Sequence, residues 1–342
     1  RTNIMQIRNN IINFKIRGNW TLYNNVFALL YQRDLFIINL SREIPSIIIY
    51  IHIAKIEIVI NTQYFNLKYT LECGQCFRWK KIYEDDKSIS YIGVIKDRVL
   101  KVTQVSNVIH VKSNNFENLK DVVVNYFDLD TDYGKIESDI SKIDENVKLA
   151  VKNTSGIRNL RQDFFEMIIS YIISANNNIP RISKSIDEIS KRYGTEINFE
   201  GEAYYLFPTV NQLSNVTKDE FRKCGVGFRD KYLFDTVSDI KNGKFDICNF
   251  KEISTEKLRK KLMELSGVGP KVADCILLFS TLKRFEVFPI DVWVRRVMND
   301  LYIHTEDETK VSKKQIENLA KEKFGELEGI AQQYLFYWRR EN

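Results

Sequence analysis

Apolar and polar residues follow two different patterns along this chain of 342 residues. From about Ile56 to Lys112 the apolar residues occur in short runs rich in β-branched side chains, which predicts strands. Beyond about Phe116 they recur every three or four positions, which predicts helices. The expected strands span residues 91–95, 99–104 and 108–112, with turns at 96–98 and 106–107. We therefore expect an α+β fold in which a small N-terminal antiparallel β domain precedes a larger all-α body.

Two of the helical segments have recognisable ends. Asp163, followed three residues later by Glu166, is similar to a capping box and predicts an apolar helix that ends near Ala175. Isoleucines at positions 179, 182, 186 and 189 lie on one face of a second helix, for which Gly194 is the expected C-cap. Further helices are expected at about 217–224, 229–241, 255–264, 270–280, 291–302 and 312–323.

The chain divides into three parts by composition. Residues 1–55 are crowded with Ile, Asn, Tyr and Arg and show no helical period, so we predict an atypical extension that is non-native or disordered. Residues 56–150 are expected to form the antiparallel β domain with flanking helices, and residues 151–342 the helical domain. Because the chain begins at Arg1 rather than Met, we interpret the first part as upstream sequence read in frame or as a poorly ordered extension. N-terminal sequencing of the natural protein tests this, since a mature terminus near Arg1 would contradict it.

Charge and cysteine content narrow the function classes. The net charge of +6 fits a nucleic-acid partner without demanding one. Cys73 and Cys76 form a C-x-x-C pair, half of a zinc site, but no second close pair completes it. The five cysteines are therefore expected to be free thiols in a reducing compartment, and a four-cysteine iron–sulfur cluster is excluded. The longest uncharged run near the start, Ile44 to Ala54, is too short for a membrane span, so no membrane association is expected.

The segment from Leu262 to Cys275 predicts a helix–hairpin–helix at residues 258–280. Gly267 and Gly269 form a turn in which glycine permits positive φ and close approach of the backbone, and Pro270 suits the first position of the next helix. Backbone N–H groups at such a turn can bind a phosphate without reading sequence. The alternative is an ordinary turn between two helices.

Lys271 lies in the first turn of that second helix, where the positive end of the helix dipole disfavours a cation. The same field, together with burial, favours the neutral and nucleophilic amine. Taken alone, an exposed solvated lysine is the better interpretation. Asp291, which lies 20 positions later, favours a catalytic lysine instead. Asp291 is the expected N-cap of a following helix, and a carboxylate beside the lysine would also stabilise positive charge on the sugar of a departing nucleotide.

At this point the sequence resembles the 8-oxoguanine DNA glycosylases of the eukaryotic type, a branch of the helix–hairpin–helix DNA glycosylase superfamily that also occurs in some bacteria. We expect a bacterial member. The resemblance covers roughly residues 60–342 and implies a helix–hairpin–helix glycosylase body. It is carried, in the same order, by residues 74–79, 126–130, 156–163, 174–179, 225–229, 267–275 and 289–291.

The resemblance implies a role for each matching position. Lys271 matches the nucleophile that forms a Schiff base with the deoxyribose, and Asp291 matches the catalytic aspartate. Gly74 matches the glycine whose carbonyl accepts from the N7–H that distinguishes 8-oxoguanine from guanine. The remaining positions are Cys275 and Phe336 around the flipped base, Gln332 at its Watson–Crick edge, Asn176, Arg181 and Arg229 at the orphaned cytosine, Phe228 as the wedge, and Gly267 and Gly269 at the DNA-binding hairpin.

Each position also has a simpler interpretation. Gly74 can be a turn glycine, Cys275 and Phe336 core residues, Arg181 and Arg229 surface arginines, and Phe228 an internally packed ring. Gln333 beside Gln332 leaves the register of the amide open by one residue. The sequence departs from the family at Trp293, where members commonly have histidine, and at Phe228, where they often have tyrosine.

The resemblance implies a base-excision repair enzyme that removes 8-oxoguanine from double-stranded DNA and cleaves the strand by β-elimination. It implies a monomer without a required cofactor, although hairpin carbonyls offer a site for a structural cation. The expected location is cytoplasmic and nucleoid-associated in a bacterium, or nuclear in a eukaryote. Two alternatives stay open. One is a helix–hairpin–helix glycosylase for another damaged purine, and the other is a non-catalytic DNA-binding module.

Overall fold

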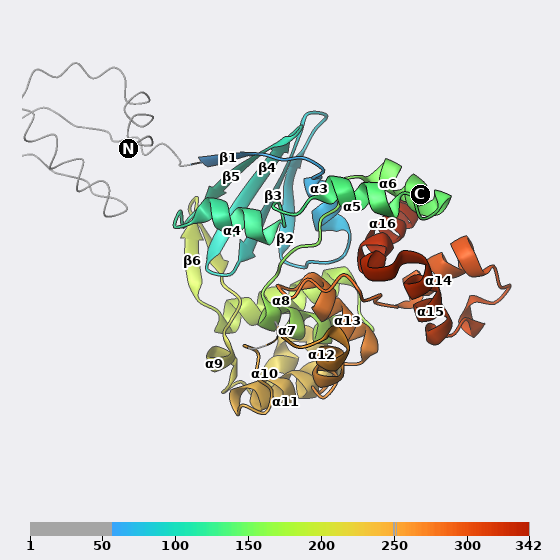
Figure 1. The fold of residues 1–342 in the computed structure, drawn as a ribbon. Helices are drawn as coiled ribbons and strands as arrows, with labels where there is room; N and C mark the ends of the chain where they lie inside the picture. Colours follow the sequence, from blue (N-terminus) through green and yellow to red (C-terminus); the bar gives the residue numbers. More distant parts are fainter. Residues whose placement is uncertain (1–56, 249, 251, 342) are drawn as a thin grey trace, which may run out of the picture. The chain divides into compact units, whose positions relative to one another are not determined.

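The computed structural model describes residues 57–248, 250 and 252–341 (Figure 1). The predicted extension, residues 1–55, lies outside the described residues, and the domain boundaries at residues 55 and 150 stay predictions. Within the described ranges, no helix is both long enough and apolar enough to cross a membrane.

A five-stranded antiparallel sheet forms the first part. Its strands are β1 (Glu57–Asn61), β2 (Trp79–Glu84), β3 (Ser88–Ile95), β4 (Arg98–Val105) and β5 (Val108–Ser113), in the spatial order β1-β5-β4-β3-β2. The three predicted strands are confirmed as β3, β4 and β5. Sequence reasoning missed β1 and β2 because they are the edge strands: five of the six residues of β2 are exposed, so no apolar alternation marks it.

The sheet is covered by helices α3 (Leu67–Glu72) and α4 (Leu119–Tyr126), and α4 crosses one of its faces in Figure 1. Leu100 and Val102 of β4 and Ile109 and Val111 of β5 are fully buried in this core. Successive residues of a strand point to opposite faces of the sheet. Because the buried residues are two positions apart, they lie on the same face of each strand, which is the face toward the helices.

Two helices, α5 (Tyr133–Ile140) and α6 (Glu145–Thr154), connect the sheet to the helical body. A buried ionic cluster joins these regions. The fully buried carboxylate of Asp128 pairs with Arg161 and, at 2.7 Å, with Lys283. Buried Arg158 donates to the carbonyls of four residues of this region and stacks on the Tyr133 ring at 4.5 Å. Removing one partner of such a buried pair leaves an uncompensated charge, so the cluster specifies how the two regions meet.

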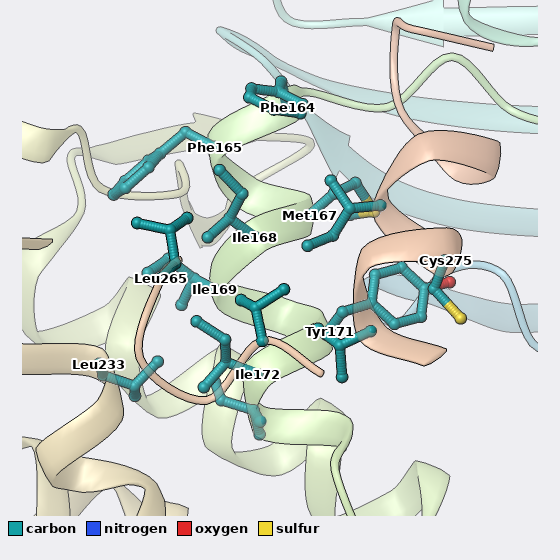
Figure 2. Close-up of a cluster of buried hydrophobic side chains, with 14 of the residues drawn as sticks. Phe164, Phe165, Met167, Ile168, Ile169, Tyr171, Ile172, Leu233, Leu265 and Cys275 are labelled. Carbon is teal, nitrogen blue, oxygen red and sulfur yellow. The ribbon is translucent and has the colours of Figure 1, made fainter. Parts of the chain in front are cut away.

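Helix α7 (Phe164–Ser174) is the centre of the helical body, since every residue from Phe164 to Ile173 is buried. Figure 2 shows its side chains meeting Leu233 and Leu265 on one side and the helix that carries Cys275 on the other. Around it lie α8 (Ile179–Tyr193), the hairpin β6 (Glu196–Phe199) and β7 (Glu202–Tyr205), α9 (Val210–Leu213), α10 (Lys218–Phe221), α11 (Asp230–Lys241), α12 (Thr255–Leu262) and α13 (Pro270–Phe279). A separate core contains α14 (Val292–Met298), α15 (Lys313–Phe324) and α16 (Glu328–Glu341), packed on α5 and α6.

The predicted helices are present, with local differences. Asp163 caps α7 by accepting from the Glu166 N–H at 2.9 Å, but the Glu166 side chain is buried near Arg78 at 3.8 Å. Ile179 is exposed, and only the later isoleucines of α8 are buried. The segments at 217–224 and 291–302 are each interrupted by a π-helical turn, over Arg222–Val226 and Asn299–Ile303. Helix α16 was not predicted, although its buried residues Ile330, Ala331, Tyr334 and Leu335 recur at helical spacing.

Asn159 gives a prediction about stability. Its side chain is 1% exposed, and neither its amide nitrogen nor its amide oxygen has a hydrogen-bond partner among the described residues. A buried polar group without a partner is destabilising. Asn159→Leu is therefore expected to raise the free energy of unfolding by about 1 kcal/mol in urea denaturation. A lower free energy of unfolding for this variant would contradict it and indicate that buried water satisfies the amide.

Candidate active site

The predicted helix–hairpin–helix consists of α12, a turn and α13. Gly267 in the turn has φ +82°, and an added Cβ would lie 2.8 Å from Tyr232 ring atoms, so both conformation and space require glycine. Gly269 does not use the positive φ that glycine permits, since as the N-cap of α13 it has φ −91°. Apart from its chain neighbours, no described residue has an atom within 4 Å of where its Cβ would be, so its backbone is open to the close approach that was expected. Arg259 of α12 and buried Asp274 of α13 form an ion pair at 2.7 Å that fixes the two helices.

Lys271 is the second residue of α13 and is partly exposed. Its ammonium nitrogen lies 5.5 Å from the ring centroid of buried Tyr171. Figure 2 shows the Tyr171 ring beside the turn of α13 that carries Cys275. The Lys271 side chain is also close enough to the Cys275 thiol to lower its pKa. The amine is thus held at the edge of the core between an aromatic face and a thiol.

Cys275 is buried, and this burial raises the pKa of its thiol to about 11. The positive charge of Lys271 opposes the rise in pKa, while the carboxylates of Asp274 and Asp291 add to it. The thiol is therefore protonated at neutral pH and offers an uncharged, polarisable surface rather than a thiolate nucleophile. Lys271 and Asp291 therefore both act electrostatically on the Cys275 thiol, although no hydrogen bond or ion pair among the described residues joins Asp291 to Lys271 or Cys275.

Asp291 is the N-cap of α14, as expected. Its Oδ1 accepts a hydrogen bond from the Val294 N–H at 2.8 Å, and the residue is partly exposed. Ile290, immediately before it, is buried and fixes the start of the helix. A charged N-cap on a buried loop is a rigid carboxylate, which suits stabilisation of a developing positive charge.

The loop that carries Gly74 is anchored by its neighbour Gln75. The buried Gln75 amide donates to the carbonyls of Thr70, at 2.8 Å, and Arg158, at 2.7 Å, and accepts from the Leu160 N–H. The Gln75 carbonyl in turn accepts from the Tyr171 hydroxyl at 3.2 Å. Tyr171 therefore connects this loop to Lys271. Gly74 itself has φ +92°, and no described residue donates a hydrogen bond to its carbonyl.

Phe336 of α16 forms a wall shared by two hollows. One is a groove of about 380 Å³ that is also lined by Trp293 of α14 and by arginines. The other is a smaller hollow that contains Gln332. The Gln332 amide nitrogen donates to the Pro289 carbonyl at 2.7 Å, two residues before Asp291, and its amide oxygen is buried without a hydrogen-bond partner among the described residues. Gln333 is also buried but lines neither hollow, which favours Gln332 for a contact beside Phe336.

A second group of predicted residues lies at the α7–α8 loop. Buried Arg229 donates to the carbonyls of Ala175 and Val226 and, at 2.9 Å, of Asn176, and it stacks on the Phe228 ring at 4.4 Å. Phe228 is 57% exposed and contacts Tyr232, the ring that packs at Gly267. Asn176 and Arg181 are exposed. Arg229 thus supports the Asn176 loop through backbone carbonyls, while the cytosine contacts of Asn176, Arg181 and Arg229 and the wedge role of Phe228 stay predictions.

Comparisons with known proteins decide the family. A model of the 8-oxoguanine DNA glycosylase N-terminal domain matches residues 57–168, and one of the HhH-GPD superfamily of base excision DNA repair proteins matches residues 169–326. An N-glycosylase/DNA lyase of Arabidopsis thaliana is 31% identical over 284 residues, which cover 79% of this chain and 76% of that protein. The chain belongs to the 8-oxoguanine DNA glycosylase family.

Two further relatives agree with this assignment. A crystal structure of the Clostridium acetobutylicum 8-oxoguanine glycosylase/lyase, in complex with double-stranded DNA containing cytosine opposite 8-oxoguanine, has a TM-score of 0.75 and 43% identity; the match covers 82% of this chain and 93% of that one. A probable N-glycosylase/DNA lyase of Methanothermobacter thermautotrophicus is 34% identical over 212 residues, 56% of this chain and 66% of that protein. The helix–hairpin–helix glycosylase body expected from the sequence is confirmed.

Sequence reasoning missed several residues that support the site of this glycosylase. Tyr171, Gln75 and Gln162 hold the Gly74 loop, and the Gln162 amide donates to the carbonyls of Gln75, at 2.8 Å, and Phe279, at 3.1 Å. Gln75 and Gln162 lie in segments 74–79 and 156–163, which carry the resemblance, but their roles could not be assigned because each acts through a partner more than 80 positions away. The described residues contain no group of three or more His, Cys, Asp or Glu side chains able to hold a metal ion, and the hairpin cation stays a prediction.

Proposed function

We propose that this protein excises 8-oxoguanine from duplex DNA and cleaves the resulting abasic strand through a Schiff base on Lys271. The observation that carries the proposal is Lys271 of α13 beside the Tyr171 ring, which acts together with Asp291 on the electrostatics of the buried Cys275 thiol, in a chain of this family. A non-catalytic phosphate-binding hairpin would have no use for an amine and a carboxylate acting on one buried thiol.

The proposed reaction begins with a nucleotide turned out of the helix, which costs a few kcal/mol that contacts in the pocket offset. The Lys271 amine forms a bond to C1′ as the N-glycosidic bond breaks and the base leaves with the bonding electrons. Asp291 stabilises the positive charge that develops on the sugar. Loss of a proton and opening of the sugar ring give an imine between Lys271 and C1′. The imine acidifies the C2′ protons, so that β-elimination expels the 3′ phosphate.

Lesion recognition is proposed to rest on Gly74 and Gln332. The Gly74 carbonyl would accept from the N7–H of 8-oxoguanine, whereas guanine would place its N7 lone pair against the same oxygen. The buried Gln332 amide oxygen, which has no partner among the described residues, suits the N1–H and amino donors of a guanine-type Watson–Crick edge. Cys275 and Phe336 would then enclose the base plane.

The proposal extends to partner and location. We propose that the protein acts as a monomer on double-stranded DNA, in the nucleoid-containing cytoplasm of a bacterium or in the nucleus of a eukaryote. The chemistry assigned to Lys271 and Asp291 requires no metal, and the hairpin carbonyls could hold a structural cation. EDTA is therefore expected to leave the chemical step unchanged.

Single-turnover excision on matched duplexes tests the function. We expect release of 8-oxoguanine opposite cytosine, strand cleavage at the abasic site, and little release of guanine from the undamaged duplex. Release of an alkylated purine such as 3-methyladenine with 8-oxoguanine left intact would replace this proposal by the other glycosylase function. Binding without any excision would favour the non-catalytic module.

Gly74→Ala tests the recognition part. Apart from the chain neighbours, no atom of the part of the chain that the structure describes lies within 4 Å of the added Cβ, so its effect comes from a φ of +92° that an L side chain rarely adopts. We expect excision of 8-oxoguanine to slow by about tenfold, equivalent to about 1.4 kcal/mol, with cleavage of preformed abasic sites retained. Gly201→Ala is the matched control, because Gly201 has φ +88° and equally open space on the β6–β7 turn. Equal effects of both variants on excision would contradict the assignment.

A further inference from the structure

Arg340, near the end of α16, contacts two elements that are proposed to hold the lesion. Its Nη2 donates to the Glu72 carbonyl at 2.7 Å, although the two residues are 268 positions apart. Glu72 is the last residue of α3 and lies two residues before Gly74. The guanidinium carbon of Arg340 also lies 4.9 Å from the Tyr337 ring centroid and 5.9 Å from that of Phe336. One side chain therefore touches the approach to the Gly74 loop and the face of Phe336.

The contact at Glu72 has a clear physical basis. The last carbonyls of a helix lack intrahelical partners, and a cation at this end interacts favourably with the helix dipole. Arg340 supplies both the donor and the charge to α3. On the other side of Gly74, Gln75 is fixed by hydrogen bonds to Thr70, Arg158 and Leu160. Gly74 thus lies between Gln75, which is anchored in the interior, and Glu72, which is anchored to α16.

The neighbouring arginine behaves differently. Arg339 pairs with Asp300 of the π-helical turn, and Arg296 pairs with Glu308 at 2.6 Å. All three arginines line the groove beside Trp293 and Phe336, but of them only Arg340 is hydrogen-bonded to α3. Arg340 therefore links α16 to α3, whereas Arg296 and Arg339 line the groove without contacting α3 through a hydrogen bond.

We propose that Arg340 is a positioning residue for lesion recognition, which sets the Gly74 carbonyl relative to the Phe336 ring. This inference rests on the proposed function. The base plane must be enclosed on one side while its N7–H reaches a carbonyl on another element, and a displacement of about 1 Å can cost a factor of about one hundred in rate. Arg340 fixes that relation by donating from Nη2 to the Glu72 carbonyl of α3, while its guanidinium pairs with Glu341 at 3.0 Å and lies over the Tyr337 ring of α16.

The test compares two reactions of the same protein. Excision of 8-oxoguanine needs the base pocket, whereas cleavage of a preformed abasic site needs Lys271 but no base contact. For Arg340→Met we expect excision to fall at least tenfold while abasic-site cleavage stays within twofold of wild type. Arg340→Lys should recover part of the loss, because an ammonium can donate to the Glu72 carbonyl but lacks the planar face. Abasic-site cleavage also reports that each variant is folded.

Arg98→Met is the matched control. Arg98, the first residue of β4, likewise donates to backbone carbonyls, but these belong to Asn115 and Glu117 and not to α3. Arg98→Met should therefore leave the ratio of the excision rate to the abasic-site cleavage rate unchanged. The inference is overturned if Arg340→Met leaves the ratio of the two rates unchanged or lowers both rates together. If the wild type cleaves abasic sites but excises no 8-oxoguanine, the proposed function fails as well, so the two failures can be told apart.

Discussion

Replacing Lys271 by glutamine is expected to abolish the covalent adduct that borohydride forms between this protein and a duplex containing 8-oxoguanine. Glutamine keeps a polar side chain of similar length at the second position of α13 but cannot form an imine. Excision should fall by at least about a thousandfold, because loss of a catalytic nucleophile commonly costs that much or more. Duplex binding should persist, since the hairpin backbone is unchanged.

Lys260→Gln is the control for this result. Lys260 lies on α12 of the same hairpin, is exposed, and pairs with Glu256 at 2.8 Å, so its replacement removes one positive charge from the hairpin and leaves Lys271 in place. This variant should form the adduct at nearly the wild-type level. An adduct that persists in Lys271→Gln would mean that another amine is the nucleophile.

Replacing Asp291 by asparagine is expected to separate its two roles. Asparagine caps helices about as well as aspartate, so the hydrogen bond from the Val294 N–H and the free energy of unfolding should be retained. The negative charge is lost, and single-turnover excision should fall by about a hundredfold to a thousandfold, the magnitude typical of removing one group that stabilises transition-state charge. Adduct formation on preformed abasic sites should be less affected, because no glycosidic bond is broken there.

Asp291→Ala completes this comparison. It removes both the charge and the cap, so it should lower the free energy of unfolding by about 1 kcal/mol relative to Asp291→Asn. Urea denaturation measured beside the kinetics tests both effects. If Asp291→Asn excises 8-oxoguanine at the wild-type rate, Asp291 is only a helix cap and the charge-stabilising role is wrong.

The sequence predicted those parts of the structure that local patterns encode. Strands β3 to β5, the caps at Asp163 and Asp291, and the hairpin around Gly267 all follow from short-range spacing and turn chemistry. It failed at β2, whose exposed edge position leaves no alternation, and it did not include α16, although Ile330, Ala331, Tyr334 and Leu335 recur there at helical spacing. Glycine at Gly269 permits positive φ, but as the N-cap of α13 this residue has φ −91°.

The candidate site shows the same division. Lys271 and Asp291 could be found from motif and resemblance, and both act electrostatically on the Cys275 thiol. The residues that fix their surroundings could not be found in this way. Tyr171 reaches Gln75 across 96 positions, and Arg340 reaches Glu72 across 268. Such contacts depend on the tertiary fold, which no local window of the sequence contains.

Peptide mapping of the borohydride-trapped complex tests the central claim most directly. The wild-type protein is trapped on a duplex containing 8-oxoguanine opposite cytosine, digested, and analysed by tandem mass spectrometry. We predict that the nucleotide remnant is found on the side-chain nitrogen of Lys271. A remnant on any other amine, or the absence of an adduct while base release proceeds, would contradict the mechanism.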